Sequence, residues 1–381
     1  MIASPTTKRL ARLRVDFVGS FLRPQSLKDA YAEFESGKID RAVLSVIQDA
    51  AIRDLIARED ERGMPIVGDG EFRRRNFQQS FQGVAGFDLG KSWSPTGRTG
   101  GDQELGLKPV TTARQPATEP LRLLNNNLLE EYSFAVSCTQ SPVKVTLIGP
   151  DRIVQSYDPD ASRDVYADSD AFADAVVGVH RQMIGELRAA GCAYVSIDAP
   201  SYTAYVDARS MAEMRGRGED PAQNMQRAIR WDNAIVEAFP EVTFGIHLCR
   251  GNRRSKSHRE GSYEAIAEQL FGTLKHDRFL LEYDNDRAGS FEPLRFVPKG
   301  KIVVLGLITT KIGQLEKVDE LQRRIEEASR FIPIDQLALS PQCGFASELE
   351  GNLLTEDDQW RKLDVMLETA SRVWGTTGVG G

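Results

Sequence analysis

The chain has 381 residues, of which 41% are hydrophobic and 27% are charged, a composition typical of globular proteins and unlike that of disordered chains. Its 48 Lys and Arg against 55 Asp and Glu give a net charge of −7, which makes nucleic acid and anionic membranes poor partners. Neither a secretory apolar run at the start nor a stretch long enough to span a membrane is visible in the sequence. We therefore expect a cytoplasmic protein.

Eight short runs rich in β-branched and apolar residues predict β-strands. In chain order they span residues 16–21, 64–70, 144–149, 193–198, 243–249, 278–284, 301–309 and 337–343. Several are almost continuously apolar, which is typical of parallel strands that are covered on both faces. Segments between them, such as 171–190 and 261–274, repeat apolar residues at the helical period.

Eight alternations of strand and helix predict an α/β fold, a closed (β/α)8 TIM barrel that forms a single domain over residues 1–381. A doubly wound open sheet would show the same alternation. However, no G-x-G-x-x-G follows the first run, so the dinucleotide-binding version of that fold lacks its phosphate loop.

One connection is much longer than the others. Roughly 75 residues separate the second and third runs, far more than a βα unit requires, so we expect residues 83–140 to be an insertion. Its Gly-, Thr- and Pro-rich middle (92–109) predicts a hairpin or excursion. A long loop after a barrel strand lies on the face that carries active sites, which makes the insertion a candidate for substrate selection.

Four residues of types that commonly bind metals lie at or near the ends of three predicted strands. His247 and Cys249 are two residues apart, so their side chains should point to the same side, while Glu282 and Cys343 lie near the ends of the sixth and eighth runs. A barrel brings the ends of its strands to one mouth. An imidazole, two thiolates and a carboxylate suit tetrahedral Zn²⁺, and the sulfurs disfavour Mg²⁺ and Ca²⁺.

The alternative is that these residues only pack. Buried Cys is commonly inert, and a His in a strand is commonly satisfied by hydrogen bonds within the core. The other two cysteines, Cys138 and Cys192, have no such neighbours in the sequence and are expected to be structural. Four cysteines so far apart do not form a disulfide framework.

Six motifs give the chain a resemblance to a known family over nearly its whole length. They are VGSF at 18–21, DGEFRR at 69–74, IDAP at 197–200, HLCRGN at 247–252, LEYD at 281–284 and SPQCGF at 340–345. The chain resembles the cobalamin-independent methionine synthase family, specifically its C-terminal catalytic barrel and the single-barrel relatives. This resemblance implies a barrel of the uroporphyrinogen decarboxylase and methionine synthase type, and a Zn²⁺ cofactor held by His247, Cys249, Glu282 and Cys343.

The charges of these ligands indicate which chemistry suits the site. Two thiolates and one carboxylate around a dication leave a formal charge of −1, so the metal should be a weak Lewis acid. It can still hold a thiol as a nucleophilic thiolate, suited to attack on an electrophilic carbon. With the resemblance, this predicts a zinc-dependent methyltransferase that moves a methyl group from 5-methyltetrahydrofolate or another donor to homocysteine, giving methionine.

The resemblance also implies roles for other residues. Ser20 would hold the carboxylate of homocysteine, and Glu71 and Asp198 would bind its ammonium group. Asp198 would also be a catalytic residue. Lys311 stands nearest the place of a proton-shuttling His and is a candidate proton donor. Simpler interpretations of the same residues are a helix cap at Glu71, a turn at Asp198 and an exposed surface lysine.

Two arginines are candidates for an anion site on one substrate, because guanidinium groups match carboxylates, sulfonates and phosphates. These are Arg73 in DGEFRR and Arg250 in HLCRGN. A solvated charged rim is the simpler interpretation of such clusters.

The chain departs from the family pattern in two places. Ala199 stands where the family has Glu, so one polar group is lost, and the segment TLIGPDR lacks the tryptophan expected to stack on a folate pterin. The alternatives are therefore alkylation of another thiol, such as epoxyalkane:coenzyme M transfer, demethylation of a small methylated compound, and a metal-free decarboxylase-like or ligand-binding barrel. The expected partners are a small thiol acceptor and a methyl or alkyl donor, and a homo-oligomer is compatible with the sequence.

Overall fold

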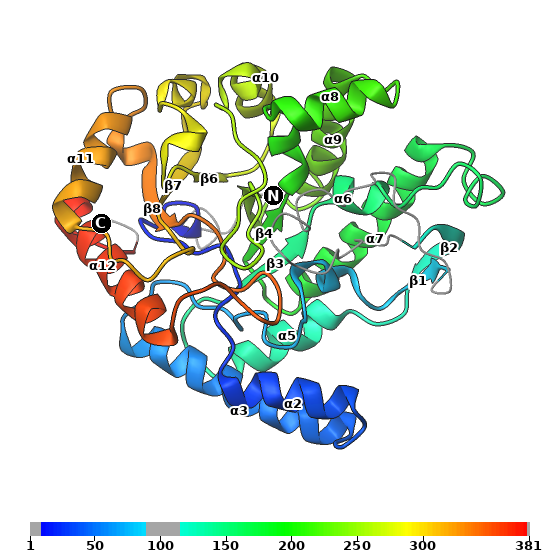
Figure 1. Ribbon diagram of the computed structural model, residues 1–381, viewed down its shortest axis with the longest axis horizontal. Coiled ribbons are helices and arrows are strands. Elements are labelled where there is room, and N and C mark those ends of the chain that lie inside the picture. The colour runs from blue at the N-terminus through cyan, green and yellow to red at the C-terminus, as the bar shows by residue number, and fades with distance from the viewer. Residues whose placement is uncertain (1–8, 89–114, 379–381) are drawn as a thin grey trace.

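The structure, a computed structural model, describes residues 9–88 and 115–378. A parallel sheet with the strand order β3-β4-β5-β6-β7-β8 lies at its centre (Figure 1). Each strand pairs with the next one along the chain, in agreement with six of the eight runs expected to be strands. The strands are β3 (Lys144–Ile148), β4 (Tyr194–Asp198), β5 (Thr243–Leu248), β6 (Arg278–Glu282), β7 (Ile302–Ile308) and β8 (Leu337–Pro341).

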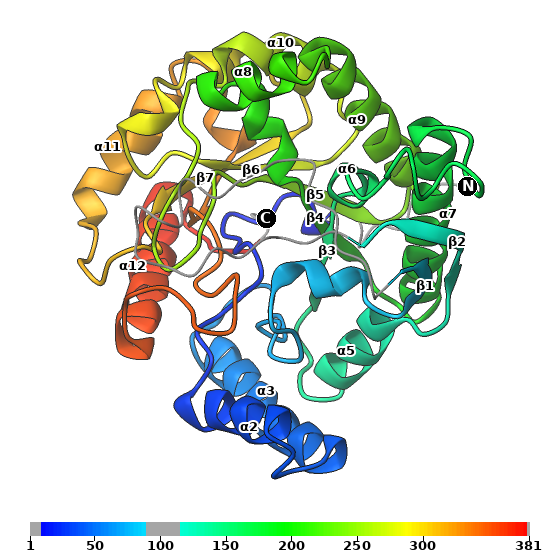
Figure 2. The ribbon, with the colours of Figure 1, turned by 45° about the vertical axis from the view of Figure 1, so that its right-hand side comes forward.

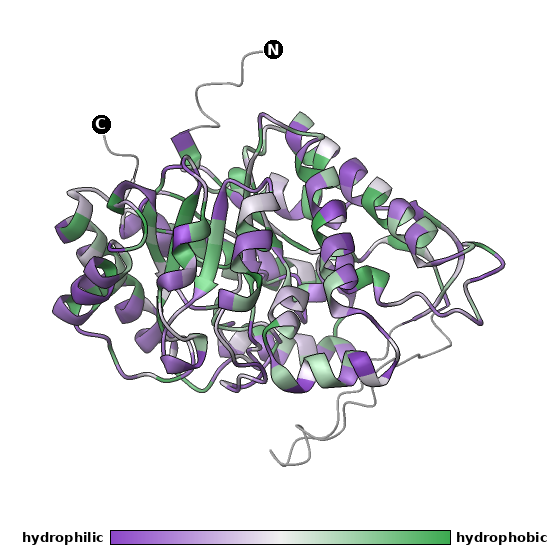
Figure 3. Cartoon of the chain, turned by 90° about the horizontal axis from the view of Figure 1, so that it is seen from above, coloured by the Kyte–Doolittle hydropathy of each residue, from purple (hydrophilic) through white to green (hydrophobic). Residues whose placement is uncertain are grey.

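Helices lie around the outside of these strands (Figure 2). The strands are buried along almost their whole length, which explains their continuous apolar sequences. Apolar residues gather on the strands, whereas the outer helices show polar surfaces (Figure 3). The helices are α2 (Gln25–Glu35), α3 (Arg41–Glu61), α5 (Asn127–Val136), α6 (Pro150–Val154), α7 (Ser169–Ala189), α8 (Ala208–Gly216), α9 (Pro221–Val236), α10 (Glu264–Thr273), α11 (Val318–Ala328) and α12 (Glu356–Trp374).

The first two runs, 16–21 and 64–70, are not strands, which corrects our expectation. Each segment is joined to the sheet by a single parallel bridge: Val15, just before the first segment, pairs with Leu339 in β8, and Val67 pairs with Val143 just before β3. The two segments therefore lie along the two outer strands of the sheet. They are also joined to each other, since the Phe21 N–H donates to the carbonyl of Gly70 at 3.2 Å.

Local chemistry explains why these two segments leave the strand conformation. The side chain of Asp16 accepts the backbone N–H of Phe17, which removes that donor from a ladder. At the other segment, Gly70 (φ 66°) and Glu71 (φ 60°) have left-handed backbones, which end an extended strand. Both segments therefore follow the sheet for only one bridge and then turn.

The expected insertion is described at its two ends. A two-stranded antiparallel sheet joins β1 (Val84–Phe87) to β2 (Ala117–Leu123), and α5 leads from there to β3. The middle of the insertion, residues 92–109, lies outside the described residues. Within the described part, β2 meets the outer helix α7, and the backbone N–H of Leu121 donates to the hydroxyl of Tyr166, three residues before that helix begins. No helix in the described ranges is long and apolar enough to cross a membrane.

Two cores pack against the sheet. The larger core joins the outer face of the sheet to the helices and extends from Leu10 to Ala370. The smaller is an aliphatic layer on the inner face, formed by Leu280, Ile302, Val304 and Ala338. Since Arg278, Leu280 and Glu282 alternate along β6, this layer lies between the groups at the amino ends and those at the carboxyl ends of the strands.

An ionic network fills the inner face at the amino ends of the strands. The carboxylate of Asp16 accepts bonds from Lys144 (2.7 Å), Tyr194 (2.6 Å) and Arg278 (2.9 Å), the first residues of β3, β4 and β6. The side chains of all three charged residues are completely buried. Burial alone would raise the pKa of Asp16, but Lys144 and Arg278 lower it below its ordinary value. The network therefore holds an ionised carboxylate between three strands.

We predict that Asp16→Asn destabilises the protein by about 3–5 kcal/mol, because it leaves two buried cations without a counter-charge. The midpoint of urea unfolding measures the effect. Arg361→Ala is the control, since the Arg361–Asp357 pair is exposed and its loss should change stability by about 1 kcal/mol or less. Equal midpoints for the two variants would show that the network does not stabilise the sheet.

Candidate metal centre

Four buried side chains meet at the carboxyl ends of the strands. His247, Cys249, Glu282 and Cys343 each offer one ligand atom, and these atoms lie within 4.8 Å of one another. The two Sγ atoms are 3.7 Å apart, and His247 Nε2 is 4.0 Å from Glu282 Oε1. The structure therefore brings together the four residues that the sequence analysis selected as metal ligands.

Strand geometry explains this convergence. His247 is the next-to-last residue of β5 and Cys249 follows two residues later, so the alternation of a strand turns both side chains inward. β6 pairs with β5 in parallel, and Glu282 is its last residue. Cys343 comes from the loop after β8, where Gly344 allows a close approach, because a Cβ there would lie 2.1 Å from Ser20 Oγ.

The four groups fit a tetrahedral zinc ion. Zn–S bonds of about 2.3 Å place two sulfurs of one tetrahedron roughly 3.7 Å apart, and the observed separation is 3.7 Å. His247 Nδ1 lies 3.2 Å from the carbonyl of Leu280, which places a proton on Nδ1 and leaves Nε2 free to bind a metal. That buried Nε2 atom has no hydrogen-bond partner in the described part of the chain.

Surrounding donors hold the ligands in place. The backbone N–H of Arg250 donates to Glu282 Oε1 at 2.6 Å, and Arg287 donates to Glu282 Oε2 at 2.7 Å. The N–H of Gly251 lies 3.3 Å from Cys249 Sγ. Such contacts orient ligands and tune their charge. Arg287 was not found in the sequence analysis, because nothing in its local sequence indicates that it reaches Glu282.

The electrostatics of the centre favour a cation. Burial lowers the pKa of His247, but Cys249, Asp198 and Glu282 raise it more strongly, to about 9. The hydrogen bond with Cys343 and burial raise the pKa of Cys249 well above its ordinary value. Protons therefore balance this group of acceptors when no metal is bound, and a bound metal would displace them.

Two carboxylates lie beside the centre. Glu71 is 5% exposed, its Oε1 accepts the hydroxyl of Thr146 at 2.7 Å, and it has a positive φ of 60°. Asp198 ends β4 and pairs in register with His247. Burial raises the pKa of Asp198 to about 7. The nearby carboxylates of Glu71 and Glu282 add to this rise, whereas His247 opposes it. Among the described residues, neither Glu71 Oε2 nor Asp198 Oδ1 has a hydrogen-bond partner.

Ser20 lies against the loop that carries Cys343. Its hydroxyl oxygen is 3.4 Å from the backbone N–H of Ala346, and its carbonyl accepts the N–H of Phe345 at 2.8 Å. The structure thus places Ser20 next to the metal centre. Its contact with a substrate carboxylate stays a prediction.

Lys311 joins the loops that follow β5 and β7. Its Nζ donates to the carbonyl of Gly251 and to Oδ1 of Asn252, each at 3.0 Å. Asn252 in turn donates to the carbonyl of Gly344 at 2.6 Å, so this chain of bonds also reaches the loop of Cys343. Lys311 is nearly buried, not a surface lysine, and its role as a proton donor stays a prediction.

The two arginines of the expected anion site do not join this group. The guanidinium of Arg73 pairs with Asp49 on α3 and lies 4.8 Å from the ring centre of Phe134. The guanidinium of Arg250 lies 4.3 Å from the ring centre of Tyr263.

Arg23 is a further residue that the sequence analysis missed. Its buried guanidinium donates to the carbonyls of Glu71 (2.9 Å), Arg74 (2.7 Å), Ala346 (2.9 Å) and Glu348 (3.2 Å). It therefore joins the turn of Glu71 to the loop after Cys343. All four acceptors are backbone atoms, so no side-chain pattern in the sequence could reveal them.

Comparison with known proteins identifies the family. The sequence model described as the catalytic domain of cobalamin-independent synthase matches residues 14–371. The chain belongs to this family. Its relatives include the uncharacterized protein YxjH of Bacillus subtilis, 35% identical over 372 residues with 96% of each chain covered. The methionine synthase of Pyrococcus abyssi is 25% identical, covering 87% of this chain and 86% of its own length.

A solved structure agrees with the family assignment. The putative vitamin-B12 independent methionine synthase of Listeria monocytogenes has a TM-score of 0.75 and 28% identity, covering 96% of this chain and 99% of its own. The resemblance to cobalamin-independent methionine synthases is thereby confirmed. The family consists of methionine synthase-type methyltransferases and is generally zinc-dependent.

We predict that Cys343→Ser weakens zinc binding, because it removes one of the metal ligands. Loss of a residue that only orients a ligand costs roughly 10- to 100-fold in metal affinity, and we expect a larger loss here. Metal analysis and competition with a chromogenic chelator measure this change, starting from one zinc per chain in the unaltered protein. Cys138→Ser is the matched control, since Cys138 lies outside the cluster. Equal zinc affinity in both variants would exclude Cys343 as a ligand.

Proposed function

We propose that this protein is a zinc-dependent methyltransferase that moves a methyl group to the thiol of homocysteine and produces methionine. The observation that carries the proposal is the cluster of His247, Cys249, Glu282 and Cys343 next to two carboxylates with unpaired oxygens. A zinc ion held there would bind the sulfur of a thiol and keep it deprotonated near neutral pH.

The protein's own side chains account for recognition of the amino acid. An ammonium group prefers anionic acceptors, and Glu71 Oε2 and Asp198 Oδ1 are two buried oxygens with no partner among the described residues. The backbone and hydroxyl of Ser20 would meet the carboxylate. With the ammonium and carboxylate fixed, the thiol of homocysteine would be aligned with the metal centre, and alignment of this kind accelerates displacement reactions.

Transfer forms an S–CH3 bond and breaks the bond between the methyl group and the donor, whose leaving atom must accept a proton. In our proposal Lys311 supplies that proton, as its ammonium group is held by Gly251 and Asn252 in the loop that follows Cys249. The proposed donor is 5-methyltetrahydrofolate or another molecule with an electrophilic methyl group.

A second candidate is alkylation of another thiol, such as the opening of an epoxide by coenzyme M, or demethylation of a small methylated compound. The absence of tryptophan from TLIGPDR favours it, because that tryptophan would be expected to stack on the pterin of a folate donor. The metal centre would have the same task in each reaction.

We also propose that the fold is a closed (β/α)8 barrel in one domain. The bridges of Val15 and Val67 to the two outer strands of the sheet support it, as does the bond between Phe21 and Gly70 that joins the two segments. In such a barrel the segments 16–21 and 64–70 would occupy the places of the first and second strands, each held by one bridge in place of a full ladder.

We predict that zinc-loaded protein forms methionine from homocysteine and 5-methyltetrahydrofolate, measured by mass spectrometry, and that Cys343→Ser reduces turnover strongly while Cys138→Ser does not. The same assay with other methyl donors, and with coenzyme M and an epoxide, tests the second candidate. Turnover with coenzyme M and none with homocysteine would contradict the first proposal.

A further inference from the structure

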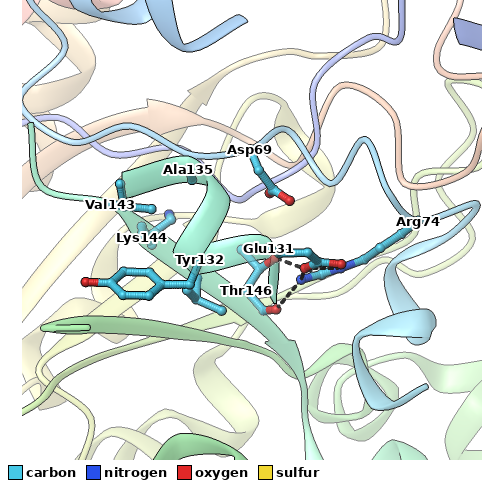
Figure 4. A pocket seen from close by; sticks show the side chains of 9 residues that line it. Asp69, Arg74, Glu131, Tyr132, Ala135, Val143, Lys144 and Thr146 are labelled. Atoms are coloured by element: carbon cyan, nitrogen blue, oxygen red, sulfur yellow. Dashed lines mark hydrogen bonds and ion pairs between the residues drawn. The ribbon is translucent and has the colours of Figure 1, made fainter. Parts of the chain in front are cut away.

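A buried ion pair lies behind Glu71, between α5 and β3. Arg74 donates to both carboxylate oxygens of Glu131, at 3.2 and 3.1 Å from Nε and 2.6 Å from Nη2 (Figure 4). The side chains of the two residues are 2% and 6% exposed. The guanidinium also donates to Thr146, from Nη1 to its hydroxyl and from Nη2 to its carbonyl, each at 3.0 Å.

Thr146 connects this pair to Glu71. Its hydroxyl accepts a hydrogen bond from Arg74 and therefore must donate its own proton to Glu71 Oε1, at 2.7 Å. The hydroxyl thus has a defined direction, which a threonine with a free rotor would lack. Arg74 Nη1 is also 3.7 Å from Glu71 Oε1, so both contacts fall on the same oxygen of Glu71.

The space around these residues does not suit a substrate. The cavity lined by Asp69, Arg74, Glu131 and Thr146 has a volume of ≈ 10 Å³, about the room that one water molecule needs. No ligand larger than water fits there. The cluster is therefore part of the wall behind Glu71 and acts on the site through that residue.

Charge explains why Glu131 is present. Arg74 alone would neutralise Glu71 and reduce its attraction for a cation. Burial raises the pKa of Glu131 to about 7 against the lowering effect of Arg74, and above that pH the group formed by Glu71, Arg74 and Glu131 has a formal charge of −1. This surplus charge is available at Glu71 Oε2, the oxygen without a partner in the described ranges.

We infer that Thr146, Arg74 and Glu131 are positioning residues that turn Glu71 Oε2 toward the substrate's ammonium group and keep its negative charge unneutralised. The inference rests on the proposed function, because it assigns selection for an amino acid thiol to this cluster. The backbone of Glu71 is consistent with it, since a positive φ in a non-glycine residue is costly and persists where surrounding contacts enforce it.

The test compares binding of two thiols to zinc-loaded protein by isothermal titration calorimetry. The thiols are L-homocysteine and 4-mercaptobutanoate, which has the same chain and carboxylate but no ammonium group. Thr146→Val removes the hydroxyl at nearly equal volume, and Thr146→Ser restores it. Glu131→Gln removes the charge behind Arg74, with Glu130→Gln as its control on the exposed face of the same helix.

We expect Thr146→Val and Glu131→Gln to weaken homocysteine binding by about 10-fold or more, the usual effect of losing a hydrogen bond to a charged group. Binding of 4-mercaptobutanoate and the zinc content should remain unchanged. Thr146→Ser and Glu130→Gln should bind both thiols like the unaltered protein. Because the two variants change separate positions, the test still gives a result if one of them fails to fold.

Three results would overturn the inference. They are unchanged homocysteine binding in Thr146→Val and Glu131→Gln, equal weakening of both thiols, and failure of the unaltered protein to prefer homocysteine over 4-mercaptobutanoate. The proposed function fails separately, if homocysteine binds with this preference but is never methylated.

Discussion

The rest of the structure depends on keeping several acceptors close together in a site that is buried from solvent. Two thiols, an imidazole and a carboxylate lie within 4.8 Å of one another, with Asp198 and Glu71 nearby. Negative groups at such distances repel strongly in a buried site. A cation offsets this repulsion, and the donors that already face Glu282 and Cys249 are backbone N–H groups and Arg287. The site is thus suited to bind a cation in addition to the charge of Arg287.

Rigid elements keep this arrangement in place. Three of the functional side chains, Asp198, His247 and Glu282, are placed by the last residues of neighbouring parallel strands, where strand spacing determines their separations. The loops that carry the other side chains of the site are held by hydrogen bonds from Arg23, Lys311 and Asn252 to backbone atoms. Strands therefore set the metal side of the site, whereas buried cations and amides join the loops around it.

Six strands and all four candidate ligands were predictable, because apolar runs and strand-end chemistry are properties of short segments. The partners of Arg73 and Arg74 were not predictable. The two residues are neighbours in one motif, yet Arg73 turns outward to Asp49 on α3 and Arg74 turns inward to Glu131 on α5. Those acids lie 24 residues before and 57 residues after their partners. Similarly, the segments 16–21 and 64–70 have strand-like composition, but their turns depend on contacts made after folding.

The aliphatic layer of Leu280, Ile302, Val304 and Ala338 has a consequence for proton movement. Its four side chains offer no donor or acceptor on β6, β7 and β8, whereas the hydroxyls of Tyr194 and Ser196 on β4 lie beside Leu280, at Gly245. Protons consequently have no conducting path through these four side chains. A proton that moved between Asp16 and the acceptors at the carboxyl ends of the strands would therefore have to use the hydroxyl-bearing side of the sheet, at β4, where Tyr194 already donates to Asp16.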